Sequence, residues 1–124
     1  MAKVSVYYQG VEVLQYDREL PLPILQQHYV TRMDRRMDGG VDLDGRHVAV
    51  PDAMERAQFV AGAMAQALSS GDETKAAAMF TYLVQRLPLL RAVRIDRQNQ
   101  RLTTELVIGD ANTVPDSSPG RSGR

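Results

Sequence analysis

The sequence of 124 residues contains no cysteine and no tryptophan. The absence of cysteine excludes disulfide bonds, thiolate zinc sites and cysteine nucleophiles. Basic and acidic side chains number 15 each, so the formal net charge is zero and no overall field attracts nucleic acid or an anionic membrane. No apolar run reaches the roughly 18 residues of a membrane-spanning helix, and none opens the chain. We therefore expect a cytoplasmic protein without a membrane segment.

The remaining composition is that of an ordinary globular protein. Apolar residues make up 44% and charged residues 24%, which is enough for one hydrophobic core in a chain of this length. After Gly109 the sequence changes to Asp, Asn, Pro, Ser, Gly and Arg with almost nothing apolar. We predict a single domain over residues 1–109 and a disordered C-terminal tail over residues 110–124.

Alternating apolar residues near the N-terminus predict a β-hairpin around Gln9-Gly10. A two-residue turn would pair Tyr8 with Val11 and Val6 with Val13, and a glycine bulge at the turn is an equally good alternative. The register of this first hairpin is therefore open.

The second face of this hairpin also contains apolar residues. In the simple alternation, Tyr7, Leu14 and Tyr16 fall on the face opposite Val4 and Val6. A partly apolar exposed face often marks a subunit interface. We therefore expect a homodimer.

A second hairpin is predicted over residues 93–108, with a polar turn at residues 97–100. The expected cross-strand pairs are Asp96–Arg101, Ile95–Leu102 and Val93–Thr104. Between the two hairpins, Asp44-Gly45 predicts a small hairpin or an ordered turn.

Three amphipathic helices are predicted between the hairpins. The first begins at Pro23 and ends at Gly39-Gly40, and the second begins at a capping box formed by Asp52 and Glu55. The third is capped by Asp72 and ends before Pro88. The three apolar stripes are Leu25, Tyr29, Val30, Met33 and Met37; Ala57, Val60, Ala61, Met64 and Leu68; and Ala76, Met79, Phe80, Leu83, Val84 and Leu87.

These elements together indicate an α+β fold. A single hairpin buries too little surface to be stable alone, so the N- and C-terminal hairpins should share one antiparallel sheet. About three helices should cover that sheet, and the short connection at residues 69–72 joins two of them in a central αα-hairpin.

The strongest candidate for a functional surface is the charged end of the first helix. Helical spacing places His28, Arg32 and Arg35 or Arg36 on one face, and Asp34 and Asp38 on another. The candidate binding residues of this charged surface are His28, Arg32, Arg35, Arg36 and Asp38. Because no standard catalytic motif is present, we expect a small non-catalytic accessory protein that uses this surface to bind itself or another protein. We expect no cofactor.

Two alternatives remain open. One is an enzyme whose site is assembled around His28, Asp34, Asp38 and His47. The carboxylates near Gly45 do not have the spacing of a calcium loop, no glycine pair opens a helix as a phosphate loop does, and we expect no metal site.

The other alternative is a nucleic-acid binder. The last predicted hairpin contains Arg91, Arg94, Arg97 and Arg101, and Arg86 precedes it. Arginines in strands and turns can contact phosphates, but no aromatic residues for base stacking accompany them. We regard nucleic acid as the less favoured partner.

Overall fold

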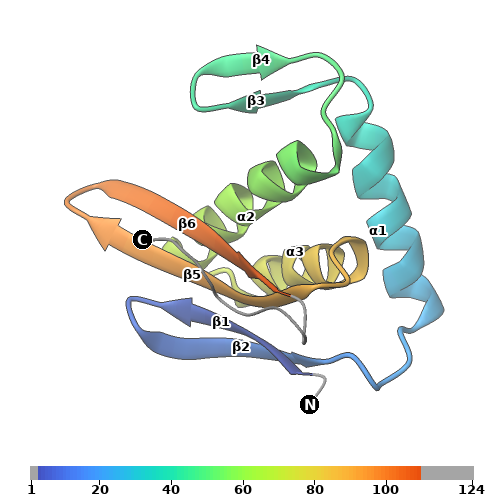
Figure 1. Cartoon of the computed structure of the whole chain (residues 1–124), viewed down its shortest axis with the longest axis horizontal. Coiled ribbons are helices and arrows are strands. Elements are labelled where there is room, and N and C mark those ends of the chain that lie inside the picture. The colour runs from blue at the N-terminus through green and yellow to red at the C-terminus, as the bar shows by residue number, and fades with distance from the viewer. Residues whose placement is uncertain (1–2, 110–124) are drawn as a thin grey trace.

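The computed structural model describes residues 3–109, so the predicted disorder of residues 110–124 lies outside the described residues. Six strands and three helices are formed within this range (Figure 1). Their order is β1 (Lys3–Tyr8), β2 (Val11–Asp17), α1 (Ile24–Met37), β3 (Val41–Leu43), β4 (Arg46–Val48), α2 (Ala53–Ser69), α3 (Glu73–Arg86), β5 (Leu90–Gln98) and β6 (Arg101–Ile108). The chain has the predicted α+β fold.

The two terminal hairpins share one four-stranded sheet with the order β2-β1-β5-β6. Each hairpin is antiparallel, but the central strands β1 and β5 are parallel, with Ser5 beside Ala92 and Tyr8 beside Ile95. The sheet is therefore mixed, and the expectation of a fully antiparallel sheet is wrong at this pair. Parallel neighbours need a long crossover, which the helical middle of the chain supplies.

The first hairpin has the predicted two-residue turn, but its bulge lies at Val13 and not at the glycine, so the predicted pair Val6–Val13 is wrong. Tyr8 pairs with Val11 across a tight turn, and both turn residues, Gln9 and Gly10, have positive φ angles of 51° and 83°. A bulge then shifts the register, so that Val6 faces Leu14 instead of Val13. A shift of one residue moves the following side chains to the other face of a sheet.

The bulge corrects the prediction of an apolar outer face. Leu14 and Tyr16 lie on the same side as Val4 and Val6 and pack against the core, where the Tyr16 ring meets Phe80 edge-on at 6.3 Å between centroids. The outer face loses two of the three apolar residues from which a homodimer was predicted.

The last hairpin has a tighter turn than predicted. Gln98 pairs with Arg101 and Ile95 with Thr104, so only two residues form the turn. Asn99 takes a φ of 60°, a left-handed conformation that asparagine tolerates better than most residues. The predicted pairs Asp96–Arg101, Ile95–Leu102 and Val93–Thr104 are therefore wrong.

Helices α2 and α3 cover one face of the sheet and form the predicted αα-hairpin (Figure 1). Asp52 and Glu55 form the predicted capping box, and the Asp72 carboxylate accepts a hydrogen bond from the Lys75 amide. The apolar stripes of both helices are buried, except that Leu68 is only partly so. None of the described helices is long and apolar enough to cross a membrane.

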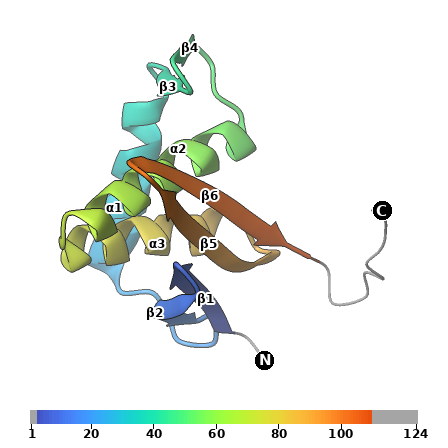
Figure 2. The same cartoon turned by 90° about the vertical axis from the view of Figure 1, so that its left-hand side faces the viewer.

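Helix α1 and the β3–β4 hairpin lie at the periphery. The hairpin is at the top of both views, away from the four-stranded sheet (Figure 1 and Figure 2). Its turn at Asp44-Gly45 is the predicted one, with positive φ angles of 51° and 77°. Helix α1 packs mainly against α3.

An arginine that follows the first hairpin fastens the sheet to the end of α3. Arg18 donates hydrogen bonds to the carbonyl oxygens of Val84 and Leu87 at 2.8 Å each, and of Leu90 at 3.0 Å. Burial lowers the pKa of this guanidinium from its ordinary value. Arg18 thereby binds carbonyl groups at the end of α3 and at the start of β5, where the regular hydrogen bonds of the helix stop.

Candidate functional site

Helix α1 is buried on one side and exposed over most of its surface. Val30 and Met37 are in the core and Met33 packs against it, as the apolar stripe predicted. Leu25 is part of the same stripe but is 80% exposed, and Ile24 is 67% exposed. The prediction that Leu25 packs in the core is wrong, because residues four apart are offset by about 40° around a helix of 3.6 residues per turn, and this drift brings Leu25 to the outer side beside His28 and Arg32.

The inner side of α1 is held by one carboxylate. Asp34 accepts a hydrogen bond of 2.6 Å from the hydroxyl of Tyr82 and one of 2.7 Å from Nε of Arg86. Arg56 of α2 donates to the Asp34 carboxylate at 3.2 Å and to its backbone carbonyl at 3.0 Å. Asp34 therefore joins all three helices.

The environment of Asp34 favours its charged form. Burial disfavours a carboxylate, but the hydrogen bonds from Tyr82, Arg86 and Arg56 outweigh burial and hold the pKa of Asp34 below its ordinary value. Burial and the neighbouring Asp34 charge together raise the pKa of the Tyr82 hydroxyl. The cluster thus combines one ionised acceptor, Asp34, with the neutral donor Tyr82 and the cationic donors Arg86 and Arg56. Such a cluster holds the three helices together.

Asp38 belongs to the same inner cluster. Its carboxylate accepts a bond of 2.7 Å from Nη2 of Arg56, and this bond raises the pKa of Arg56 despite some desolvation. Arg56 also donates to the Pro51 carbonyl. The structure thus places Asp38 apart from the histidine and arginines with which the sequence grouped it.

The outer side of α1 contains the other predicted site residues. His28, Arg32, Arg35 and Arg36 are all exposed. None of these arginines forms an ion pair within residues 3–109. The only acidic residue of α1, Asp34, is on the inner side. The outer side is therefore basic without local compensation.

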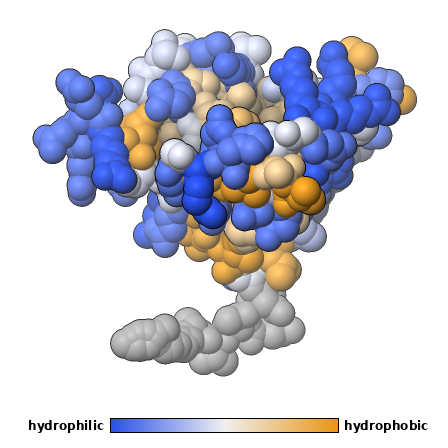
Figure 3. Space-filling view, turned by 90° about the horizontal axis from the view of Figure 1, so that it is seen from above, coloured by the Kyte–Doolittle hydropathy of each residue, from blue (hydrophilic) through white to orange (hydrophobic). Residues whose placement is uncertain are grey.

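Apolar side chains accompany these cations. Leu25 lines a shallow hollow of about 640 Å³ together with His28, Thr31, Arg32 and Arg35. On the right of Figure 3, where α1 lies, strongly hydrophilic side chains project beside hydrophobic ones. We call the exposed residues Leu25, His28, Arg32, Arg35 and Arg36 the basic α1 face.

The four residues of the predicted enzyme site are not brought together. His28 is on the basic α1 face, whereas Asp34 and Asp38 are bound to Arg56 on the inner side. His47 Nδ1 lies 2.9 Å from Asp42 Oδ1, and both side chains are mostly exposed. Within residues 3–109, no group of three or more histidine and acidic side chains could hold a metal ion.

The arginines of the last hairpin are dispersed. Arg86 binds Asp34, and Arg94 stands opposite Glu105 in the β5–β6 register. Nη1 of Arg97 lies 3.5 Å from the Ser69 hydroxyl. These positions provide no single basic patch comparable with the basic α1 face.

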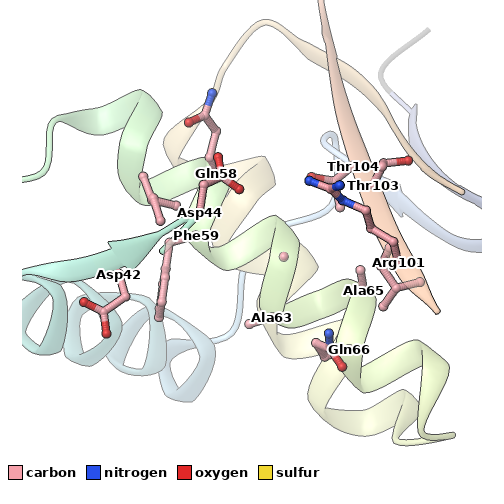
Figure 4. A pocket seen from close by; sticks show the side chains of 13 residues that line it. Asp42, Asp44, Gln58, Phe59, Ala63, Ala65, Gln66, Arg101, Thr103 and Thr104 are labelled. Carbon is pink, nitrogen blue, oxygen red and sulfur yellow. The ribbon is translucent and has the colours of Figure 1, made fainter. Parts of the chain in front are cut away.

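Sequence reasoning missed a groove between α2, β3 and β6 (Figure 4). It has a volume of about 580 Å³, and Gly62 and Ala63 of α2 form part of its floor. Asp42 and Asp44 line the β3 side and residues 101–104 of β6 line the other. The small residues Gly62 and Ala63, which lie outside the apolar stripe of α2, were the available signal, but only tertiary structure places them beside an edge strand.

No protein-family model, curated protein or solved structure matches this chain. The comparisons therefore assign neither a family nor an activity.

Proposed function

We propose that this chain is a small non-catalytic protein-interaction module and that the basic α1 face docks an acidic segment of a partner protein. One observation carries the proposal. The outer side of α1 presents Arg32, Arg35, Arg36 and His28 without an acidic neighbour on the helix, while Asp34 turns inward to bind α2 and α3.

The separation of charges on α1 supports a docking role over a purely solvated surface. A surface that only needs solubility mixes both signs, and the whole chain has as many acids as bases. On α1, by contrast, the arginines lie on the outer side and the one acidic residue, Asp34, lies on the inner side. Unpaired arginines on one face attract an acidic partner, increase its association rate and orient it.

The apolar residues favour a protein over nucleic acid. Leu25 and Ile24 extend into solvent beside the arginines. Contacts to phosphate groups are made by polar and charged side chains, so these apolar residues would contribute nothing to them. Apolar anchors surrounded by charged residues are typical of protein interfaces. The occupant we propose is an amphipathic acidic helix, with leucine against Leu25 and glutamate against the arginines.

The proposal is tested with a synthetic helical peptide that carries leucine at every third or fourth position and glutamate between. Fluorescence anisotropy with the full chain should show binding that weakens as salt is added. Charge reversal of Arg32, Arg35 and Arg36 to Glu should lower the affinity about tenfold or more at low salt. A polyglutamate peptide of equal length should bind more weakly, because it lacks the apolar contact.

A matched control reverses three arginines of β5, namely Arg91, Arg94 and Arg97. This variant has the same net charge as the α1 variant, so an effect of charge alone would weaken both equally. Equal weakening would contradict the proposal. Heparin chromatography tests the nucleic-acid alternative. This alternative would be favoured if the α1 variant is still retained on heparin and the β5 variant is not.

The homodimer that the sequence predicts stays a prediction. Its original reason is weakened because Leu14 and Tyr16 face the core. The mass of the full chain in solution, compared with 13.8 kDa for one copy, tests it directly.

A further inference from the structure

A second candidate surface lies at one of the two edges of the four-stranded sheet. Strand β6 is an edge strand, and its first half forms one side of the groove beside α2 (Figure 4). We propose that this groove binds an extended segment of a partner protein, which pairs with β6 as a fifth strand. This site is separate from the basic α1 face and does not depend on its function.

The backbone of β6 supplies the first reason. On one side β6 pairs with β5 over its whole length. Among the described residues, no other backbone hydrogen bond involves residues 101–108. An edge strand directs half of its N–H and C=O groups away from its neighbour, and these groups are a template for another strand.

The floor of the groove supplies the second reason. Gly62 is in the middle of α2, where glycine lowers helix stability relative to alanine. A Cβ atom built there would meet nothing within 4 Å, so the chain itself gives no reason for glycine. With Ala63 beside it, Gly62 leaves room for another backbone to approach α2 closely.

The walls define the chemistry of the occupant. Asp42, which already contacts His47, and Asp44 line the β3 side, whereas Arg101 lines the β6 side. Exposed Phe59 of α2 offers an apolar contact. A strand in the groove would direct alternate side chains toward α2, where small apolar residues such as valine fit. Lysine or arginine near its end would complement the two aspartates.

The β3–β4 hairpin favours a single segment over a second copy of the chain. It lies across the groove from β6, with α2 between them (Figure 4). A lone strand needs only the space beside β6. A second copy would also need room for the rest of its sheet on the side where the β3–β4 hairpin lies.

The test uses the full chain and a labelled peptide in which valine and threonine alternate between lysines at both ends. Fluorescence anisotropy should show saturable binding. Hydrogen exchange should show that the peptide slows exchange of amides within residues 101–104. Peptides N-methylated at alternate residues lose donors on one edge, and the methylation pattern that removes the bonds to β6 should lower affinity about tenfold.

A pair of variants tests the location. A Cβ atom at position 62 meets no atom within 4 Å, so Gly62→Arg directs its side chain into the groove and should lower peptide affinity about tenfold or more. Ala77→Arg adds the same side chain to an exposed position of α3 and should leave the affinity unchanged. Replacement of the peptide lysines by glutamate should weaken binding several-fold.

Several outcomes would overturn the proposal. No binding of the peptide would do so, as would binding that Gly62→Arg does not affect. Slow exchange of all amides of residues 101–104 in the peptide-free chain would show that the edge is already covered. A solution mass of two copies that Gly62→Arg returns to one copy would identify a second copy as the occupant.

Discussion

Helices α1 and α3 have the same length, 14 residues each, but they are used differently. Seven residues of α3 are buried, whereas only Val30 and Met37 of α1 are. α3 packs beside α2 against the sheet, and α1 contacts α3 from outside. The comparison shows that one helix is a structural element, while the other leaves most of its surface available for contacts with other molecules.

The largest expected difference between the two helices is in the free energy of unfolding that is lost when a leucine is replaced by alanine. Leu83→Ala in α3 creates a cavity in a fully buried position and should lower the free energy of unfolding by about 3 kcal/mol. Leu25→Ala in α1 should change it by less than about 0.5 kcal/mol. Urea denaturation of both variants measures this. Similar losses would show that Leu25 is covered in solution, against the assignment of an exposed α1 face.

The next largest effect is expected at the joint between the helices. Asp34→Ala removes the acceptor shared by Tyr82, Arg86 and Arg56 and should cost about 2 kcal/mol. Because α1 has few buried residues, its amides should also exchange with solvent faster in this variant, with little change in α3. Uniform acceleration in both helices would mean that α1 does not open separately.

A smaller effect is expected where α3 ends. Arg18→Ala removes three hydrogen bonds to carbonyl groups and should lower stability by about 1 to 2 kcal/mol. Arg18→Lys keeps the charge but not the planar fork that reaches several acceptors, so it should recover only part of the loss. Full recovery with lysine, measured by thermal unfolding, would assign the effect to charge alone.

The smallest effect concerns pH. Because the pKa of Asp34 is below its ordinary value near 3.8 in the fold, the folded chain binds this proton less tightly than the unfolded chain. The resulting stabilisation is complete above that ordinary value and is lost as the pH falls through the folded-state pKa. The stability difference between the native chain and Asp34→Asn should therefore narrow in acid. A difference that stays constant from pH 7 to pH 3 would contradict this account.

The sequence predicts the helices well because they depend on local patterns. Capping residues Asp52 and Asp72 and the apolar spacing of α2 and α3 define these elements without reference to the rest of the chain. The basic α1 face follows from helical spacing in the same way. The burial of Leu25 was predicted wrongly, because a repeat of four residues drifts around the helix and reaches the outer side of α1 at Leu25.

Registers and long-range contacts were beyond the sequence patterns. The bulge that turns Leu14 and Tyr16 inward changes the register by one residue, and alternation alone cannot place such a shift. The bonds of Arg18 to α3 and the groove beside β6 form only when distant segments meet. Asp34 was placed correctly on a separate face of α1, but its partners on α2 and α3 were not foreseen.

The parallel contact between β1 and β5 has a consequence for folding. Ser5 lies beside Ala92, so almost the whole described chain separates these partners. Each hairpin can form quickly from local contacts, but joining them requires closure of a long loop and should be slow. During synthesis the first hairpin is made long before β5. Until β5 pairs with it, Val4 and Val6, which are buried in the fold, are exposed and can aggregate with other chains.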